Sequence, residues 1–147
     1  MRHTLRAFNR IGRVIAALVL SLAAGTAAAE VVAVVSARSA VTSLSRNQVA
    51  DIFLGKAARF PDGSPAVPID QAEGAAARDE FYLSVAGKSA AQLNAHWSKI
   101  IFTGRGQPPR EVANGAAVKK LLLENPAAIG YIERSLVDGG LRVVLSE

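Results

Sequence analysis

The sequence contains no cysteine, and aromatic residues make up only 5% of it. Without cysteine the chain has no disulfide, no thiolate ligand for a metal and no cysteine nucleophile. Histidine is almost as scarce, because only one of the two, His96, lies beyond residue 29, and a lone histidine does not build a metal site. Half of the residues are hydrophobic. We therefore expect a core of aliphatic side chains packed around Phe53, Phe81, Trp97 and Phe102.

No stretch of the sequence is apolar for long enough to cross a membrane, which takes about 20 residues. The longest apolar run, residues 14–24, follows four arginines between Arg2 and Arg13 and precedes three alanines at positions 27–29. This three-part arrangement is typical of a secretory signal peptide. We therefore expect residues 1–29 to be removed by cleavage after Ala29, and the mature chain to be periplasmic without membrane insertion. An uncleaved N-terminal anchor is the alternative.

An excess of positive charge is also absent once the leader is set apart. The formal net charge is +5, but four of the 17 Lys and Arg residues and none of the 12 acidic residues precede Glu30, which leaves a net of +1 from there on. Beyond the pair Lys119–Lys120 the basic residues form no cluster, and no aromatic residues are interleaved with them. We therefore expect no binding to nucleic acid, which needs such a surface.

The order of strand and helix signals predicts an α/β fold. Residues 31–35 form a β-branched apolar run of the kind that is buried on both faces of a sheet. Ser45 and Gln48 have the spacing of a capping box at a helix start, and Ser89 and Asn114 can cap two more helices. The whole pattern predicts a single domain at residues 30–147, a three-layer sandwich with a mostly parallel sheet of about four strands and helices on both faces. The expected strands are at residues 31–35, 65–69, 129–132 and 141–145, and the expected helices begin near residues 45, 75, 89 and 114.

The helix expected after Ser89 carries an apolar stripe. Its members are Leu93, Trp97, Ile100 and Ile101, whose spacing predicts that they face the core. The loop that follows, residues 102–110, holds two glycines and two arginines that could lie against an anion. Its glycine spacing does not match a nucleotide phosphate loop. A solvated turn after the helix is the alternative.

The stretch from Ile69 to Phe81 is the main candidate for a binding site. An apolar strand ends here where an alanine-rich helix begins. The first amides of a helix have no intrahelical partner and lie at the positive end of its dipole, so they can receive an oxyanion. The alternative is an ordinary turn in which Asp70 or Glu73 caps the helix. The candidate ligand-binding residues are Gln71, Glu73, Gly74, Ala75, Ala76, Ala77 and Arg78, with Arg105 from the later loop as another source of positive charge.

No group of residues points to catalysis. The sequence has no Ser/His/Asp spacing of a hydrolase, no cluster of metal ligands and no carboxylate pair in a marked environment. We therefore expect that the protein is not an enzyme, with no catalytic residue, no cofactor and no bound metal.

Three stretches of the sequence, taken in order, resemble the periplasmic phosphate-binding proteins of ABC transporters. Residues 44–56 are similar to the helix of that family that ends in Ile-Phe-Leu-Gly-Lys, residues 71–81 to its ligand loop and helix, and residues 125–132 to its Pro-Gly-Ala-Ile-Gly-Tyr-Val strand. The resemblance implies one lobe of a type II periplasmic binding protein. It also implies a small phosphate-like oxyanion as ligand, and an ABC permease or another envelope protein as partner.

The ligand loop departs from the family pattern, which reads Arg-x-Asp/Glu-Gly-Ser-Gly-Thr. Gln71 stands where the Arg is expected and three alanines stand at positions 75–77, so that only Glu73 and Gly74 match. A missing cation and two missing hydroxyl donors remove charge-assisted hydrogen bonds of about 1.5–3 kcal/mol each. The first lobe of the family has no counterpart here. The resemblance therefore implies weak or degenerate binding, and the alternative is a ligand-free periplasmic interaction or sensor module that kept the fold.

Overall fold

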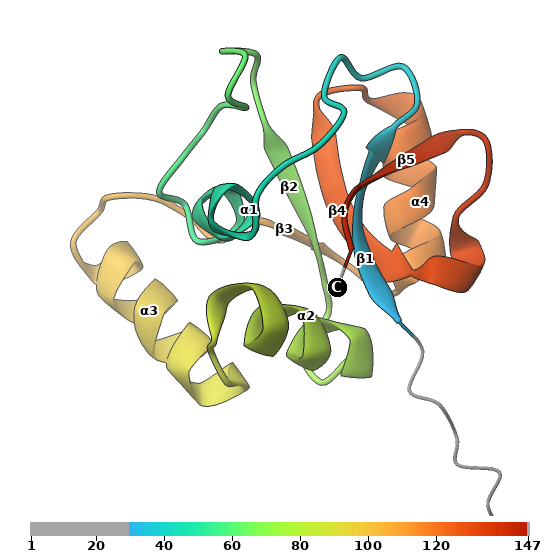
Figure 1. Ribbon diagram of the computed structural model, residues 1–147. Coiled ribbons are helices and arrows are strands. Elements are labelled where there is room, and N and C mark those ends of the chain that lie inside the picture. The colour runs from blue at the N-terminus through green and yellow to red at the C-terminus, as the bar shows by residue number, and fades with distance from the viewer. Residues whose placement is uncertain (1–29, 147) are drawn as a thin grey trace, which may run out of the picture.

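The computed structural model describes residues 30–146 as a five-stranded sheet covered by helices (Figure 1). The strands are β1 (Val31–Ser36), β2 (Val67–Gln71), β3 (Arg110–Val112), β4 (Ala128–Glu133) and β5 (Leu141–Leu145). The helices are α1 (Arg46–Phe53), α2 (Ala76–Ala86), α3 (Ala90–Phe102) and α4 (Gly115–Glu124), with a short 3₁₀ helix, Arg134–Leu136, before β5. The predicted signal peptide, residues 1–29, lies outside the described residues. Within residues 30–146 no helix is both long and apolar enough to span a membrane.

The strands lie in the order β3-β2-β4-β1-β5 and form a mixed sheet. β2 runs parallel to β3 and β4, whereas β1 runs antiparallel to β4 and β5. The predicted α/β class is confirmed, but the sheet has one strand more than expected and β1 is antiparallel to both neighbours. The apolar run of β1 could not reveal its direction, because burial on both faces produces that run whichever way the neighbours point. β3 was missed because it is three residues long and two of them are exposed.

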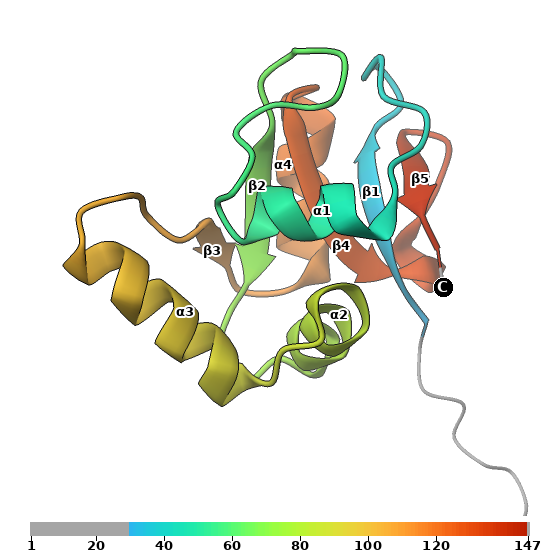
Figure 2. The ribbon, with the colours of Figure 1, turned by 60° about the vertical axis from the view of Figure 1, so that its left-hand side comes forward.

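The two faces of the sheet have separate cores, because the side chains of β1 alternate between them. Val31, Ala33 and Val35 pack with residues of α1, α2 and α3, while Val32 and Val34 pack with residues of α4. Figure 2 shows α1 and α2 in front of the sheet and α4 behind it. This is the three-layer arrangement that the sequence predicts.

Aromatic residues gather in the core beneath α1 and α2. Phe53 and Phe81 contact each other edge to face, and Phe81 stacks on Tyr131 with ring centroids 4.1 Å apart. Trp97 is buried in the same core, as predicted. Phe102 was expected here too, but that prediction is wrong, since 93% of the residue is exposed.

Helix α3 explains the exposure of Phe102. The helix begins after the predicted cap Ser89, and its buried residues are Leu93 and Trp97. Ile101 is 55% exposed, so the predicted apolar stripe is buried only over the first part of the helix. α3 lies outside α2, away from the sheet (Figure 2). Its last turn therefore has no second layer of structure to cover it.

The end of α1 holds α3 in place. The capping box of Ser45 and Gln48 is present at the start of α1, as predicted. Gly55 follows the helix with φ of +76°, a conformation that glycine adopts without strain. A Cβ at this position would lie 2.9 Å from Cη2 of Trp97. Glycine is thus needed both for the turn and for the close contact between α1 and α3.

Candidate anion-binding site

The connection from β2 to α2 has the geometry of an uncapped helix start. β2 ends at Gln71, and α2 begins at Ala76 after Gly74, whose φ is +90°. Neither expected cap binds the helix: Oε1 of Glu73 accepts a hydrogen bond from Asn94 at 3.0 Å, and no side chain caps the helix. The prediction of an ordinary turn capped by Asp70 or Glu73 is therefore wrong. The first amides of α2 have no acceptor in their own helix.

Asp70 is buried and anchors this connection instead of capping it. Its carboxylate accepts hydrogen bonds from the hydroxyls of Tyr131 and Tyr82, the latter at 2.6 Å, and from the backbone N–H of Gln71 at 2.8 Å. Burial raises the pKa of the Asp70 carboxyl, and the bonds from the two tyrosines and the charge of Arg78 oppose that rise without cancelling it. Burial and the neighbouring Asp70 also raise the pKa of both tyrosines. The network fixes the end of β2 against α2 and β4.

Arg78, a candidate cation for the ligand, is held by other groups. Its Nη1 donates to the backbone carbonyl of Gln71 at 3.0 Å and to Oε1 of Glu111 at 2.7 Å. Its guanidinium carbon lies 5.8 Å from the centre of the Tyr82 ring, within cation–π range. Arg78 is only 6% exposed. Its charge therefore ties α2 to β2 and β3.

A pocket of about 350 Å³ lies where α2 and α4 both begin. Ala76 and Ala77 of α2 line it, and so do Gly115 and Ala116 of α4. These are the first two residues of each helix, so their N–H groups have no acceptor within the helix. The cap of α4, Asn114, accepts a hydrogen bond from the N–H of Ala117 at 3.0 Å and leaves the two earlier amides uncapped. Two helix N-termini thus converge on one pocket.

The topology of the sheet creates this pocket. β2 and β3 are parallel neighbours, and the chain leaves β2 toward α2 on one face and leaves β3 toward α4 on the other face. In open α/β sheets a crevice forms outside the carboxyl ends of strands whose connections go to opposite faces, and ligands bind there. The remaining wall comes from Glu133 at the end of β4 and from Leu136. The pocket therefore has amide donors and a carboxylate, but no Lys or Arg among its lining residues.

The structure brings together only part of the predicted site. Of the eight candidates, Gln71, Ala75, Ala76 and Ala77 line the pocket, whereas Glu73, Gly74, Arg78 and Arg105 do not. The side-chain amide of Gln71 donates to the backbone carbonyl of Tyr131 at 2.9 Å. The wall formed by α4 was missed. Asn114 was predicted as a helix cap, but the sequence contains no signal that places this helix start beside that of α2.

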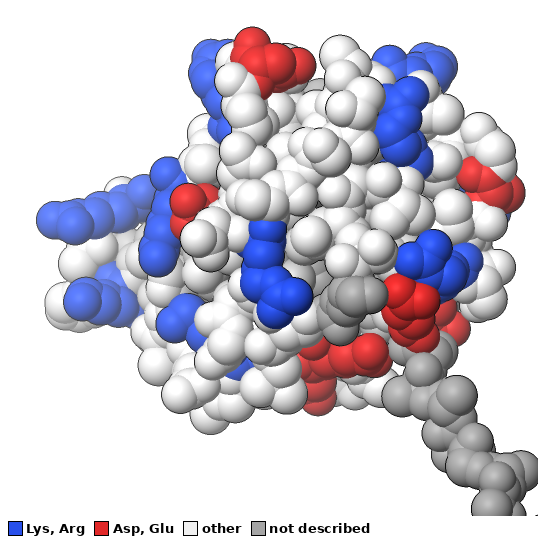
Figure 3. All heavy atoms as spheres, in the orientation of Figure 1, with Lys and Arg blue, Asp and Glu red and all other residues white. Residues whose placement is uncertain are grey.

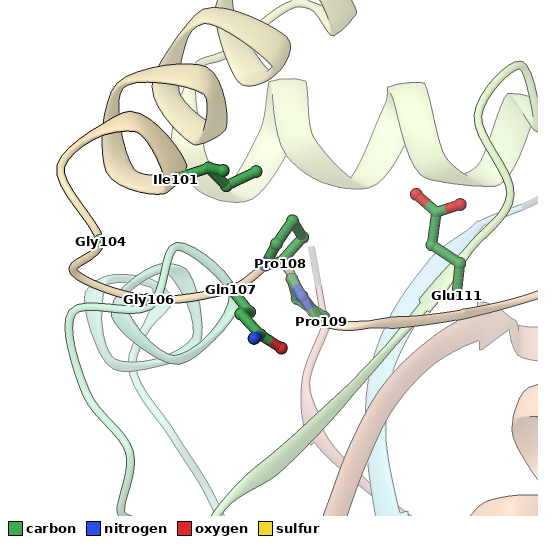
Figure 4. A pocket seen from close by; sticks show the side chains of 7 residues that line it. All are labelled: Ile101, Gly104, Gly106, Gln107, Pro108, Pro109 and Glu111. Carbon is green, nitrogen blue, oxygen red and sulfur yellow. The ribbon is translucent and has the colours of Figure 1, made fainter.

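A larger hollow of about 660 Å³ lies between the end of α3 and β3 (Figure 4). It is lined by Ile101, Pro108 and Pro109 with two glycines and Gln107, and the carboxylate of Glu111 is its one charged group. That carboxylate already receives the hydrogen bond from Arg78. Gly104 and Gly106 of the loop that was expected to lie against an anion line this hollow, but the two arginines of that loop do not. Within residues 30–146 no group of three His, Asp or Glu residues could hold a metal ion.

In open α/β sheets, ligands bind where helix starts converge at the carboxyl ends of parallel strands. The sequence matches no model of a known protein family and no curated protein, but solved structures match over 78% of the chain. One is a Clostridium perfringens protein assigned as a phosphate ABC transporter substrate-binding protein with bound phosphate, at 24% identity and a TM-score of 0.63 over 44% of that chain. Another is an ABC-type phosphate transport receptor from Vibrio cholerae, at 19% identity and a TM-score of 0.61 over 45% of that chain. A third is PstS from Borrelia burgdorferi, at 14% identity and a TM-score of 0.57 over 46% of that chain.

These similarities confirm the resemblance at the level of the fold. The chain has the fold of part of the phosphate transporter substrate-binding proteins, and it spans less than half the length of the three structures. The Clostridium and Vibrio proteins are described as a binding protein and a transport receptor, not as enzymes.

Proposed function

We propose that residues 30–147 form one exported domain that binds a small phosphate-like oxyanion weakly, in the pocket between the starts of α2 and α4. The observation that carries the proposal is the convergence of two helix N-termini on one pocket lined by Ala76, Ala77, Gly115 and Ala116. The fold likeness to a protein with bound phosphate supports the same ligand class. Cleavage after Ala29, a periplasmic location and an ABC permease or other envelope partner complete the proposal.

Weak binding follows from the groups that line the pocket. Four neutral amides supply roughly 0.5–1.5 kcal/mol of net hydrogen-bond energy each, which corresponds to dissociation constants on the order of millimolar. A guanidinium would add a charge-assisted contact, but that of Arg78 is bound to Glu111 and to the Gln71 carbonyl. Glu133 places a negative charge in the wall. Both features lower the affinity for an anion.

Isothermal titration of the mature domain with phosphate, sulfate and molybdate at low salt tests the proposal. We expect weak binding of phosphate that depends little on added salt, because the Glu133 carboxylate offsets the positive ends of the two helices. A submicromolar affinity for any of the three anions would contradict the weak site. Absence of binding at concentrations well above the millimolar range would reject oxyanion binding and favour the alternative function.

Two sets of variants locate the site. Glu133→Gln removes the carboxylate from the pocket wall and should raise phosphate affinity roughly twofold to fivefold, the effect of one charge several ångströms away in a solvated site. Glu124→Gln, at the exposed end of α4, changes the net charge equally and should have no effect. Ala75→Ser with Ala77→Thr restores two hydroxyl donors and should also raise the affinity. If Glu133→Gln and Glu124→Gln have equal effects, the anion does not bind in this pocket.

A second candidate function is that of an interaction module without a ligand. The observation that favours it is the exposed apolar end of α3, with Ile101 and Phe102. Such a module would act by contact with another component of the envelope. The titration distinguishes the two candidates, because only the first requires anion binding at the start of α2.

A further inference from the structure

The C-terminal end of α3 carries the most exposed of the large apolar side chains within residues 30–146. Phe102 is 93% exposed and the neighbouring Ile101 is 55% exposed. Figures 1 and 2 show this end of α3 and the loop after it projecting away from the sheet. We call Lys99, Ile101, Phe102 and Arg105 the α3 tip. The side chain of Ile101 lines the open hollow between α3 and β3 (Figure 4), whereas Phe102 is not among the residues that line it.

The α3 tip is also basic. From Lys99 to Arg110 the sequence holds three basic residues, Lys99, Arg105 and Arg110, all of them exposed, and no acidic one. The first acidic residue after them, Glu111, is paired with Arg78. Figure 3 shows several Lys and Arg side chains among uncharged residues at this end of the molecule. Negatively charged partners are therefore favoured here.

Three of the last four carbonyls of α3, those of Lys99, Ile100 and Ile101, accept hydrogen bonds from the residues that follow the helix. The hydroxyl of Thr103 donates to the carbonyls of Lys99 and Ile100, at 3.1 and 3.0 Å. The N–H of Gly104 donates to the carbonyl of Ile101, and the N–H of Arg105 to that of Ile100. A helix end with free carbonyls is costly to move out of water. These bonds lower that cost for the last turn of α3.

We propose that the α3 tip docks on an anionic lipid bilayer, with Phe102 and Ile101 entering the interface between headgroups and acyl chains while Lys99 and Arg105 contact the anionic headgroups. Aromatic and aliphatic side chains bind at that depth, and basic side chains near it are attracted to anionic lipid. A second copy of the chain is a poorer occupant. Symmetric contact between two tips would bring their basic residues together and repel.

Co-sedimentation of the mature protein with lipid vesicles tests the proposal. We expect binding to vesicles of phosphatidylglycerol and phosphatidylcholine in equal parts, and much weaker binding to phosphatidylcholine alone. Phe102→Ser should lower the partition coefficient about tenfold or more. Lys99→Gln and Arg105→Gln should each lower it about fivefold, and binding should fall with rising salt.

Matched controls come from α4, on the opposite face of the sheet. Leu123→Ser removes another exposed apolar side chain, and Lys120→Gln removes another exposed basic one. Neither should change vesicle binding. Phe102→Trp adds a direct readout, because the fluorescence of the new indole should shift to the blue on mixed vesicles, whereas Leu123→Trp should not respond. Phe102 packs little, so its variants should unfold at the same urea concentration as the parent.

Each remaining outcome would overturn the proposal. Failure to bind the mixed vesicles would exclude a lipid partner, and equal binding of the parent and Phe102→Ser would exclude the α3 tip. A dimer in sedimentation experiments without lipid that dissociates on Phe102→Ser would assign the surface to a second copy. If Lys120→Gln and Lys99→Gln weaken vesicle binding equally, the binding depends on net charge and not on the α3 tip.

Discussion

Replacing Arg78 separates its two candidate roles, as a cation for the ligand and as a tie between α2, β2 and β3. In the structure its guanidinium lies on the carbonyl of Gln71, the carboxylate of Glu111 and the ring of Tyr82. Arg78→Met keeps most of the side-chain length and removes the charge and all donors. We expect this variant to lose stability while retaining most of its weak phosphate binding.

The expected loss is a sum of three contacts. The charge-assisted bond to the buried Gln71 carbonyl contributes about 1.5–3 kcal/mol. The ion pair with Glu111 contributes at most about 1 kcal/mol, because the Glu111 side chain is 48% exposed and solvent screens the pair. The contact with the Tyr82 ring adds about 0.5–1 kcal/mol. These contacts are not additive, so we expect the free energy of unfolding to fall by about 3 kcal/mol.

Urea unfolding followed by the fluorescence of Trp97, which is buried, measures this loss. Arg46→Met is the matched control, since the exposed Arg46 makes one surface hydrogen bond, to the carbonyl of Ser84 at 2.9 Å. It should lower the free energy of unfolding by less than about 1 kcal/mol. A double-mutant cycle of Arg78→Met with Glu111→Gln should give a coupling energy of about 1 kcal/mol or less.

Phosphate titration of the same variant provides the refutation. If Arg78→Met loses less than about 1 kcal/mol of stability while phosphate affinity falls tenfold or more, the guanidinium serves the anion and the structural role is wrong. Arg78→Lys sharpens the distinction. A lysine keeps the positive charge but cannot reproduce the planar fork of donors. If the guanidinium serves the anion, Arg78→Lys should preserve phosphate binding. If it ties α2 to β2 and β3, Arg78→Lys should lose stability.

Two further predictions concern the strands beside the pocket. Gly130→Ala should destabilise the fold by about 1–3 kcal/mol in urea unfolding, because a Cβ there would clash with Cγ1 of the buried Val118 between β4 and α4. A loss below about 0.5 kcal/mol would mean that α4 is not packed so closely. Asp70→Asn should change the pH dependence of stability. Burial raises the pKa of the Asp70 carboxyl, so its ionisation costs stability as pH rises from the unfolded-state pKa, about 3.9, through the higher folded-state value. Thermal unfolding should show that the stability of Asp70→Asn relative to the parent increases as pH rises through that window. A stability difference that does not change with pH would contradict the raised pKa.

The parts of the fold that could be predicted depend on neighbours in the sequence. The capping box of Ser45 and Gln48 and the cap at Asn114 are read from residues three positions apart, and both are present. The burial of β1 follows from its own five apolar residues. Strand direction and the antiparallel position of β1 depend on which strand lies beside it. No local pattern contains that information.

The candidate site shows the same division. A helix start after β2 could be predicted because Gly74 and three alanines follow a strand, but the lack of a side-chain cap could not. The carboxylate of Asp70 was expected at the helix start, but the hydroxyls of Tyr82 and Tyr131, twelve and 61 positions away in the chain, hold it in the core. The ion pair of Arg78 with Glu111 could not be predicted, because the sequence gives no strand signal at β3. The exposed Phe102 was placed in the core because it is one of the few aromatic residues, and only the order of the layers shows that nothing covers it.

The balance of charge in the pocket limits what it can bind. Each helix N-terminus acts as about half a positive charge, so α2 and α4 together contribute about one. Glu133 contributes one negative charge to the same wall, and the two contributions roughly cancel. Hydroxyls added at positions 75 and 77 would supply donors without changing this balance. We therefore expect Glu133→Gln to change the salt dependence of phosphate binding as well as its strength, whereas Ala75→Ser with Ala77→Thr should raise the affinity and leave the salt dependence unchanged. Equal salt dependence in all these proteins would mean that the dipoles and Glu133 do not act on the same ion.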